Sequence, residues 1–162
     1  MRSGGRAVLA IGILPLVLSA CTGEVDLKQV LQIVNGSGGW YDAGVVLGKN
    51  KLVPGVTFRL RKTPEADISR VSINALFRAA DGKESGLDND VFVQNVDFEG
   101  DQTAPITVRS DNGYTAEPPQ SRADMLKHTQ FRDLRVQIFV KQGASQWVDL
   151  GRIDVRRTLI TQ

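Results

Sequence analysis

Hydrophobic residues recur at every second position in three stretches of this chain. Polar residues fill most of the positions between them, which is the pattern of strands with one buried face. The predicted inward-facing sets are Val56, Phe58 and Leu60; Val71, Ile73, Ala75 and Phe77; and Leu134, Val136, Ile138 and Val140. We expect each set to line one face of a sheet.

Two further alternating runs change parity midway. Val91 and Val93 give way to Val96 and Phe98. The run that starts at Val148 changes parity across Gly151. Because a slip of one residue moves the hydrophobic set to the opposite face, each change predicts a β-bulge or a strand that crosses between sheets.

Clusters of glycine, asparagine, aspartate and serine separate the runs and predict turns. The predicted turns are residues 35–39, 48–50, 81–83, 111–113 and 142–145. The last of these joins two well-patterned strands and predicts a hairpin.

Two segments have sequence features of a helix. Residues 27–34 fit helical spacing through Leu27, Val30, Leu31 and Val34, but valine and isoleucine favour a strand, which we prefer. Residues 121–128 follow two prolines and begin with a Ser-x-x-Asp cap, so they predict a short connecting helix.

These patterns predict an all-β fold: an immunoglobulin-like antiparallel β-sandwich of about seven or eight strands with one short connecting helix. Residues 52–61 (Leu-Val-Pro-Gly-Val-Thr-Phe-Arg-Leu-Arg), followed by residues 71–78 and Asp81-Gly82, resemble the central strands of FxLYD-like domains. These are immunoglobulin-like modules of bacterial lipoproteins. The Phe-x-Leu-Tyr-Asp signature is absent, so the resemblance implies a fold and transfers no functional residue.

The N-terminus has the three regions of a secretory signal. Arg2 and Arg6 precede an apolar run over residues 7–18, and Ser19 and Ala20 are small. The run is shorter than the ~20 residues that a membrane-spanning helix needs. We therefore expect residues 1–20 to be removed.

Leu18-Ser19-Ala20-Cys21 resembles the lipobox of bacterial lipoproteins. The resemblance implies that Cys21, the one cysteine of the chain, is lipidated and becomes the new N-terminus. The alternative is an ordinary signal followed by a chance cysteine. Two or three acyl chains would hold the protein firmly on the membrane. Thr22 is not the aspartate that retains family members at the inner membrane, which favours the outer membrane, facing the periplasm.

The remaining chain has the size and charge of one neutral domain. Residues 21–26 form a short tether, and residues 27–162 form the predicted sandwich. Removal of Arg2 and Arg6 lowers the 20 basic residues to 18, which equals the 18 acidic residues. A net charge of zero gives no reason to expect nucleic-acid binding, and a single cysteine leaves no disulfide.

Residues for catalysis or metal chemistry are sparse. His128 is the one histidine, so a Cys and His site for zinc or copper cannot form within one chain. Asp88 and Asp90, near Asp81 and Glu84, are a calcium candidate, but aspartate is also an ordinary turn residue. We expect no enzyme activity and no cofactor.

Two sets of residues are candidates for contact with a partner or ligand. Arg59 and Arg61 share a strand face with Thr57, either as a basic stripe or as a solvated outer face. Trp40 and Tyr41 are contact candidates whose default alternative is core packing.

Three functions follow from these observations. The first is a membrane-anchored envelope lipoprotein that docks a protein partner as an accessory or structural subunit. The second is a periplasmic or surface binder of a small ligand or glycan, with Trp40, Tyr41 and Tyr114 as stacking surfaces. The third is a hydrolase that uses carboxylates or His128.

Overall fold

A computed structural model describes residues 25–160, so the signal region and Cys21 lie outside the described residues. Two short helices are present in this part of the chain, α1 (Leu27–Val30) and α2 (Arg122–Lys127). The strands are β1 (Leu31–Val46), β2 (Lys49–Lys62), β3 (Arg70–Ala79), β4 (Asn89–Glu99), β5 (Gln102–Thr103), β6 (Ile106–Arg109), β7 (Tyr114–Ala116), β8 (Leu134–Lys141), β9 (Val148–Val155) and β10 (Leu159–Ile160). The expectation of an all-β fold is confirmed.

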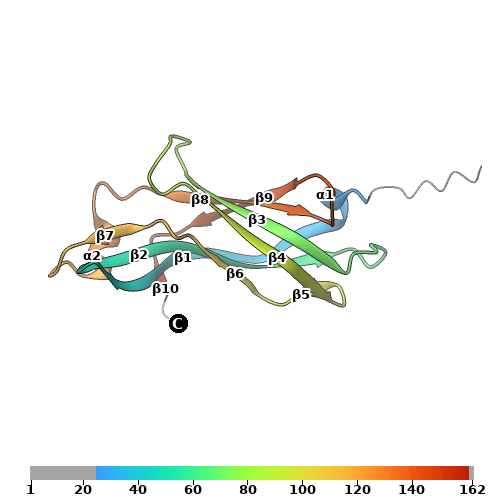
Figure 1. The fold of residues 1–162 in the computed structure, drawn as a ribbon, viewed down its shortest axis with the longest axis horizontal. Helices are drawn as coiled ribbons and strands as arrows, with labels where there is room; N and C mark the ends of the chain where they lie inside the picture. Colours follow the sequence, from blue (N-terminus) through green and yellow to red (C-terminus); the bar gives the residue numbers. More distant parts are fainter. Residues whose placement is uncertain (1–24, 161–162) are drawn as a thin grey trace, which may run out of the picture.

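The strands form one curled sheet in the order β10-β1-β2-β5-β4-β3-β8-β9, and β6 and β7 also pair with β2. The curl brings β8 and β9 across from β1 and β2 (Figure 1). The sheet is mixed rather than wholly antiparallel, because β10 runs parallel to β1 where Trp40 and Tyr41 face Leu159 and Ile160. The antiparallel expectation is therefore wrong at this edge.

The core lies inside the curl and contains the residues that alternation assigned to it. Every member of the three alternating sets in β2, β3 and β8 is buried, and these residues belong to one hydrophobic cluster. Burial of a large aliphatic or aromatic side chain stabilises the fold by roughly 1.5–3 kcal/mol. The two-residue period thus identified the inward face of each strand.

Both parity changes correspond to bulges. In β4, the pairing with β3 shifts between Val71 and Ile73, next to Asn95, which has a φ of 59°. In β9, the pairing with β8 shifts between Ile138 and Phe139, opposite Gly151 with a φ of 145°. The prediction of β-bulges is confirmed at these two places.

The strand prediction for residues 27–34 is wrong in its first half. Leu27–Val30 form a single helical turn, and β1 begins at Leu31. The Asp26 carboxylate accepts a hydrogen bond from Lys28 N at 3.0 Å and caps this turn, while Leu27 is buried. An N-cap aspartate and one buried anchor outweigh the local β propensity.

The turn prediction for residues 35–39 is also wrong, since β1 continues through them with a bulge between Val34 and Ser37. The glycines serve a close crossing instead. A Cβ on Gly38 would lie 2.6 Å from Asp154 O, and one on Gly39 would lie 2.9 Å from Thr158 O. The chain that leaves β9 crosses β1 there to start β10, and Trp40 N donates to Thr158 O at 2.9 Å.

The other predicted turns and the predicted helix are present. β1 and β2 form a hairpin around Leu47 and Gly48, with φ of 51° and 79°, and β8 and β9 form the expected hairpin. Ser121 caps α2, since its Oγ accepts from Asp124 N at 3.2 Å. The turn and cap residues in the sequence therefore predicted the local structure outside the crossing.

Replacement of Gly38 by alanine tests the close crossing. We expect Gly38→Ala to lower the free energy of unfolding by about 1–3 kcal/mol, because its Cβ would overlap Asp154 O. Gly86→Ala is the matched control, since nothing lies within 4 Å of its Cβ position, and there alanine raises stability by about 0.4–1 kcal/mol. Urea unfolding of both variants measures the difference; equal effects would refute the crossing constraint.

Replacement of Leu47 tests the strain at the hairpin tip. Leu47 is 96% exposed and has a left-handed φ of 51°, a conformation that disfavours leucine by roughly 1–2 kcal/mol. Leu47→Asn should raise the thermal midpoint, because asparagine tolerates this conformation in hairpin turns. Leu47→Ala should give no such rise, since alanine has no polar side chain to hydrogen-bond locally and favour the left-handed conformation. A rise in both variants would show that the gain comes from the loss of an exposed apolar side chain.

Candidate docking groove

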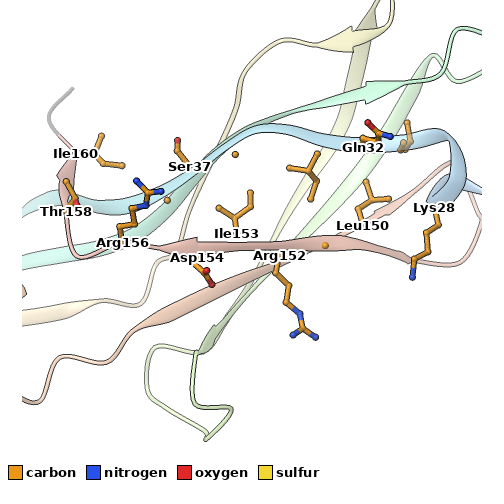
Figure 2. Close-up of a pocket in the computed structure, with 15 residues that line it drawn as sticks. Lys28, Gln32, Ser37, Leu150, Arg152, Ile153, Asp154, Arg156, Thr158 and Ile160 are labelled. Atoms are coloured by element: carbon orange, nitrogen blue, oxygen red, sulfur yellow. The ribbon is translucent and has the colours of Figure 1, made fainter.

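A hollow of about 1160 Å³ lies between β1 and β9. Figure 2 shows the two strands running side by side with apolar side chains between them. The groove extends from Lys28 in α1 to Ile160 in β10. It therefore follows a large part of one side of the domain.

The groove is open because two strand edges face each other there without pairing. β1 pairs with β2 along its length, but on its other edge the described chain pairs as a strand only at Trp40 and Tyr41, with one further hydrogen bond from Arg156 N to Gly38 O. β9 pairs with β8, and β8 lies on the side away from β1. Strand edges of this kind offer backbone donors and acceptors to another chain.

The floor of the groove is apolar. Ile33 from β1 and Leu150 and Ile153 from β9 line it, and Figure 2 shows Leu150 and Ile153 on the side of β9 that faces β1. Gly36 and Gly151 lie in the two walls, each close to a side chain of the opposite strand. A Cβ on Gly36 would lie 3.4 Å from Ile153 Cδ1, and a Cβ on Gly151 would lie 3.7 Å from Ile33 Cδ1. Glycine in a strand often marks a place where another backbone approaches closely.

The rim of the groove is cationic. Lys28, Arg152 and Arg156 line it, all are exposed, and none forms an ion pair with a described residue. The one carboxylate of the lining, Asp154, is already paired with Arg135 at 3.0 Å. The uncompensated charge of the rim is therefore positive.

Trp40 and Tyr41 do not form an exposed contact point, so that prediction is wrong and the alternative of packing is correct. Trp40 is fully buried against Tyr114 and Phe131, whose ring centres lie 5.5 and 4.5 Å from its own. Tyr41 is 5% exposed and lies under the Arg109 guanidinium, 4.0 Å from its ring centre. Alternation along β1 sends the two aromatic rings to opposite faces.

Arg59 and Arg61 share the face of β2 that points away from the core, as expected. The Arg59 guanidinium is half-buried and donates to Thr103 O at 2.8 Å, while Arg61 is exposed and faces Gln32 and Gln102 across the strands. At the other end of β2, Lys51 donates to Asp111 O at 2.8 Å. Arg59 thus has a structural role, and the solvated-face alternative explains Arg61.

The loop of the calcium candidates already surrounds a cation from the same chain. The Arg132 guanidinium lies 2.6 Å from Asp81 Oδ1 and donates to the carbonyl oxygens of Lys83 and Glu84. Asp88 accepts from Ser85 Oγ at 2.9 Å, and Asp90 is exposed in β4. Among the described residues, no group of three or more acidic, histidine or cysteine side chains could hold a metal ion.

The Asp81 carboxyl shows the electrostatic effect of this loop. A hydrogen bond from Lys83 N, followed by the Arg132 guanidinium, lowers the pKa of Asp81 below its ordinary value. Because the pKa is lowered, the favourable interaction of the Asp81 carboxylate with Lys83 N and Arg132 is present at neutral pH. It is lost as the pH falls through the pKa of Asp81 in the folded state.

His128 and Tyr114 border a separate cavity of about 160 Å³. The His128 ring is exposed, and its Nδ1 accepts from Gln130 N at 3.2 Å. Ligand pockets usually measure ~300–1,000 Å³. Tyr41 lies on the opposite face of the sheet, so the three aromatic residues of the ligand hypothesis do not form one site.

The alternating pattern did not predict two exposed apolar features. Phe92, in β4, and Trp147, in the connection just before β9, are 57% and 36% exposed. Their ring centres lie 6.0 Å apart, and the Lys141 ammonium lies 4.9 Å from the Trp147 ring centre. Val45, Val46 and Leu47 form an exposed tip on the β1–β2 hairpin. The groove was missed as well, although the parity change at Gly151 marks one of its walls.

Comparison with protein-family models, with curated proteins and with solved structures gives no match. In the described part of the chain, neither helix has the length and apolar character needed to cross a membrane.

Addition of calcium tests whether Arg132 takes the place of a metal ion. We expect millimolar calcium to leave the thermal midpoint unchanged relative to the same concentration of magnesium, because the loop oxygens already bind the Arg132 guanidinium. A calcium-specific rise that is lost in Asp88→Asn would contradict this assignment.

Proposed function

We propose that this chain is the precursor of a bacterial lipoprotein that docks a protein partner in the cell envelope. The signal region is removed, Cys21 is lipidated, and the domain stays on the outer membrane facing the periplasm. It is a non-enzymatic accessory or structural subunit. The proposed fold is an immunoglobulin-like sandwich, formed by the two halves of the curled sheet around one core.

The order of residues at the N-terminus supports this location. Leu18-Ser19-Ala20-Cys21 has the form of a lipobox, and α1 begins at Leu27. Six residues can extend roughly 3.5 Å each, so the tether would hold the α1 end within about 21 Å of the membrane. β1 then runs for 16 residues, about 50 Å, to the hairpin tip at the other end of the domain.

The groove between β1 and β9 is the observation that carries the proposal. It is larger than most pockets for small ligands and is open along its length. Apolar side chains and unpaired strand edges together suit a polypeptide, which provides both side chains and main-chain hydrogen bonds. Lys28 lines the groove and follows the tether directly, so a partner in the groove would lie near the membrane surface.

A glycan binder is the second candidate function, and one observation favours it. Phe92 and Trp147 present an exposed aromatic surface beside Gln94 and Lys141, in a hollow of about 410 Å³. Aromatic faces with polar neighbours are suited to stacking against sugars. On this alternative, Trp147→Ala would abolish retention of the protein on cell-wall glycan and leave partner capture intact.

Photo-crosslinking in cells tests the docking function. A photoreactive amino acid replaces Arg152 at the groove, Trp147 on the outer face, or Lys83 in the distant β3–β4 loop of the full lipidated chain. We expect the Arg152 position to yield one specific protein adduct, which mass spectrometry identifies, and the Lys83 position to yield none. The adduct should disappear in Cys21→Ala, because the unanchored chain would not be held beside its partner.

Two results would contradict the docking function. The first is a specific adduct at Trp147 with none at Arg152. The second is the same background of adducts at all three positions.

A further inference from the structure

The chain itself shows how a strand fits beside β1. β10 lies on the free edge of β1, in parallel, at Trp40 and Tyr41. Before it, Arg156 N donates to Gly38 O at 3.2 Å on the same edge. Along residues 31–37 the described chain adds no strand to this edge, and the groove lies beside it.

We propose that an acidic extended segment of the partner protein binds in this groove as an added strand, paired with the edge of β1 along residues 31–37. This inference rests on the docking function and names the chemistry of the partner. The added strand would lie on the same edge of β1 that β10 pairs with, and β9 would lie on its other side (Figure 2). Seven residues of β1 correspond to about 23 Å of strand.

The apolar floor determines one half of the partner sequence. In an extended segment, alternate side chains point to opposite faces. One set would pack on Ile33, Leu150 and Ile153, which are half-buried or buried in this structure. That set is therefore apolar and medium-sized, such as valine or isoleucine.

The cationic rim determines the other half of the partner sequence, namely the side chains that alternate with the apolar set. Lys28, Arg152 and Arg156 have no ion pair with described residues, while Asp154 is compensated by Arg135. Opposite charges attract at such a rim, and like charges facing each other oppose association. Aspartate or glutamate would therefore occupy the alternate positions that point outward.

A second copy of the chain fits the groove less well. Its most exposed apolar segment is the β1–β2 tip at Val45–Leu47, and Lys49 and Lys51 follow this tip. Lys49 is paired with Glu117 at 3.2 Å, whereas Lys51 has, among the described residues, only the Asp111 carbonyl as a partner, so its charge would meet the cationic rim. The charge of the rim thus favours a different, acidic chain over self-association.

Four labelled ten-residue peptides test the inference on the purified, lipidated chain in detergent. The first alternates valine and glutamate, and the second alternates valine and lysine. The third and fourth are the glutamate peptide with the backbone amides of all valines, or of all glutamates, methylated. We expect the glutamate peptide to bind roughly tenfold or more tightly than the lysine peptide in fluorescence anisotropy. One of the two methylated forms should lose this binding, because a strand pairs with β1 through one of its edges.

Charge reversal at the rim is the matched test. Arg152→Glu with Arg156→Glu should weaken binding of the glutamate peptide about tenfold and strengthen that of the lysine peptide. Lys83→Glu, an exposed lysine in the β3–β4 loop, should change neither affinity. An unchanged thermal midpoint confirms that each variant is folded.

The outcomes separate this inference from the docking function. Equal binding of both peptides, or full binding by both methylated forms, would overturn strand addition by an acidic segment, even if the crosslink at Arg152 recovers a partner. A crosslink of Arg152 to a second copy would also overturn it. Selective binding of the glutamate peptide without any adduct in cells would retain the strand site and remove the docking function.

Discussion

The arrangement of this domain depends on the close crossing of its C-terminal segment over β1. At Gly38 and Gly39 the backbone from Asp154 to Thr158 approaches so closely that no Cβ fits. The crossing carries the chain from the β9 side of the curled sheet to the β1 edge, where β10 pairs in parallel. The glycines are therefore required by packing and not by a turn.

The groove is a consequence of this crossing. Where β9 leaves its own neighbour to cross, it is close to β1, and on the α1 side of the crossing the two strands lie farther apart (Figure 2). A bulge in β1 after Val34 and a bulge in β9 at Gly151 lie along this opening. Bulges commonly redirect side chains and end pairing at functional edges, and here they leave an apolar floor with free backbone edges.

Alternation in the sequence predicted the core, since an inward-facing set needs only a period of two. It also predicted both bulges, because a bulge leaves a parity change at Asn95 and Gly151. It could not predict the role of Gly36, Gly38 and Gly39, since a glycine-rich turn and a glycine-rich crossing have the same composition. Trp40 and Tyr41 failed as contact residues because the strand continues through those glycines and buries both rings. The groove was beyond sequence analysis, because it depends on which strand edges stay unpaired.

Amide hydrogen exchange on the lipidated protein, with and without the alternating valine and glutamate peptide, tests the central claim most directly. Strand addition in the groove predicts that amides within residues 31–37 become protected, while those around Phe92 and Trp147 stay unchanged. Protection confined to the Phe92 and Trp147 face, or no change in β1, would contradict the docking groove.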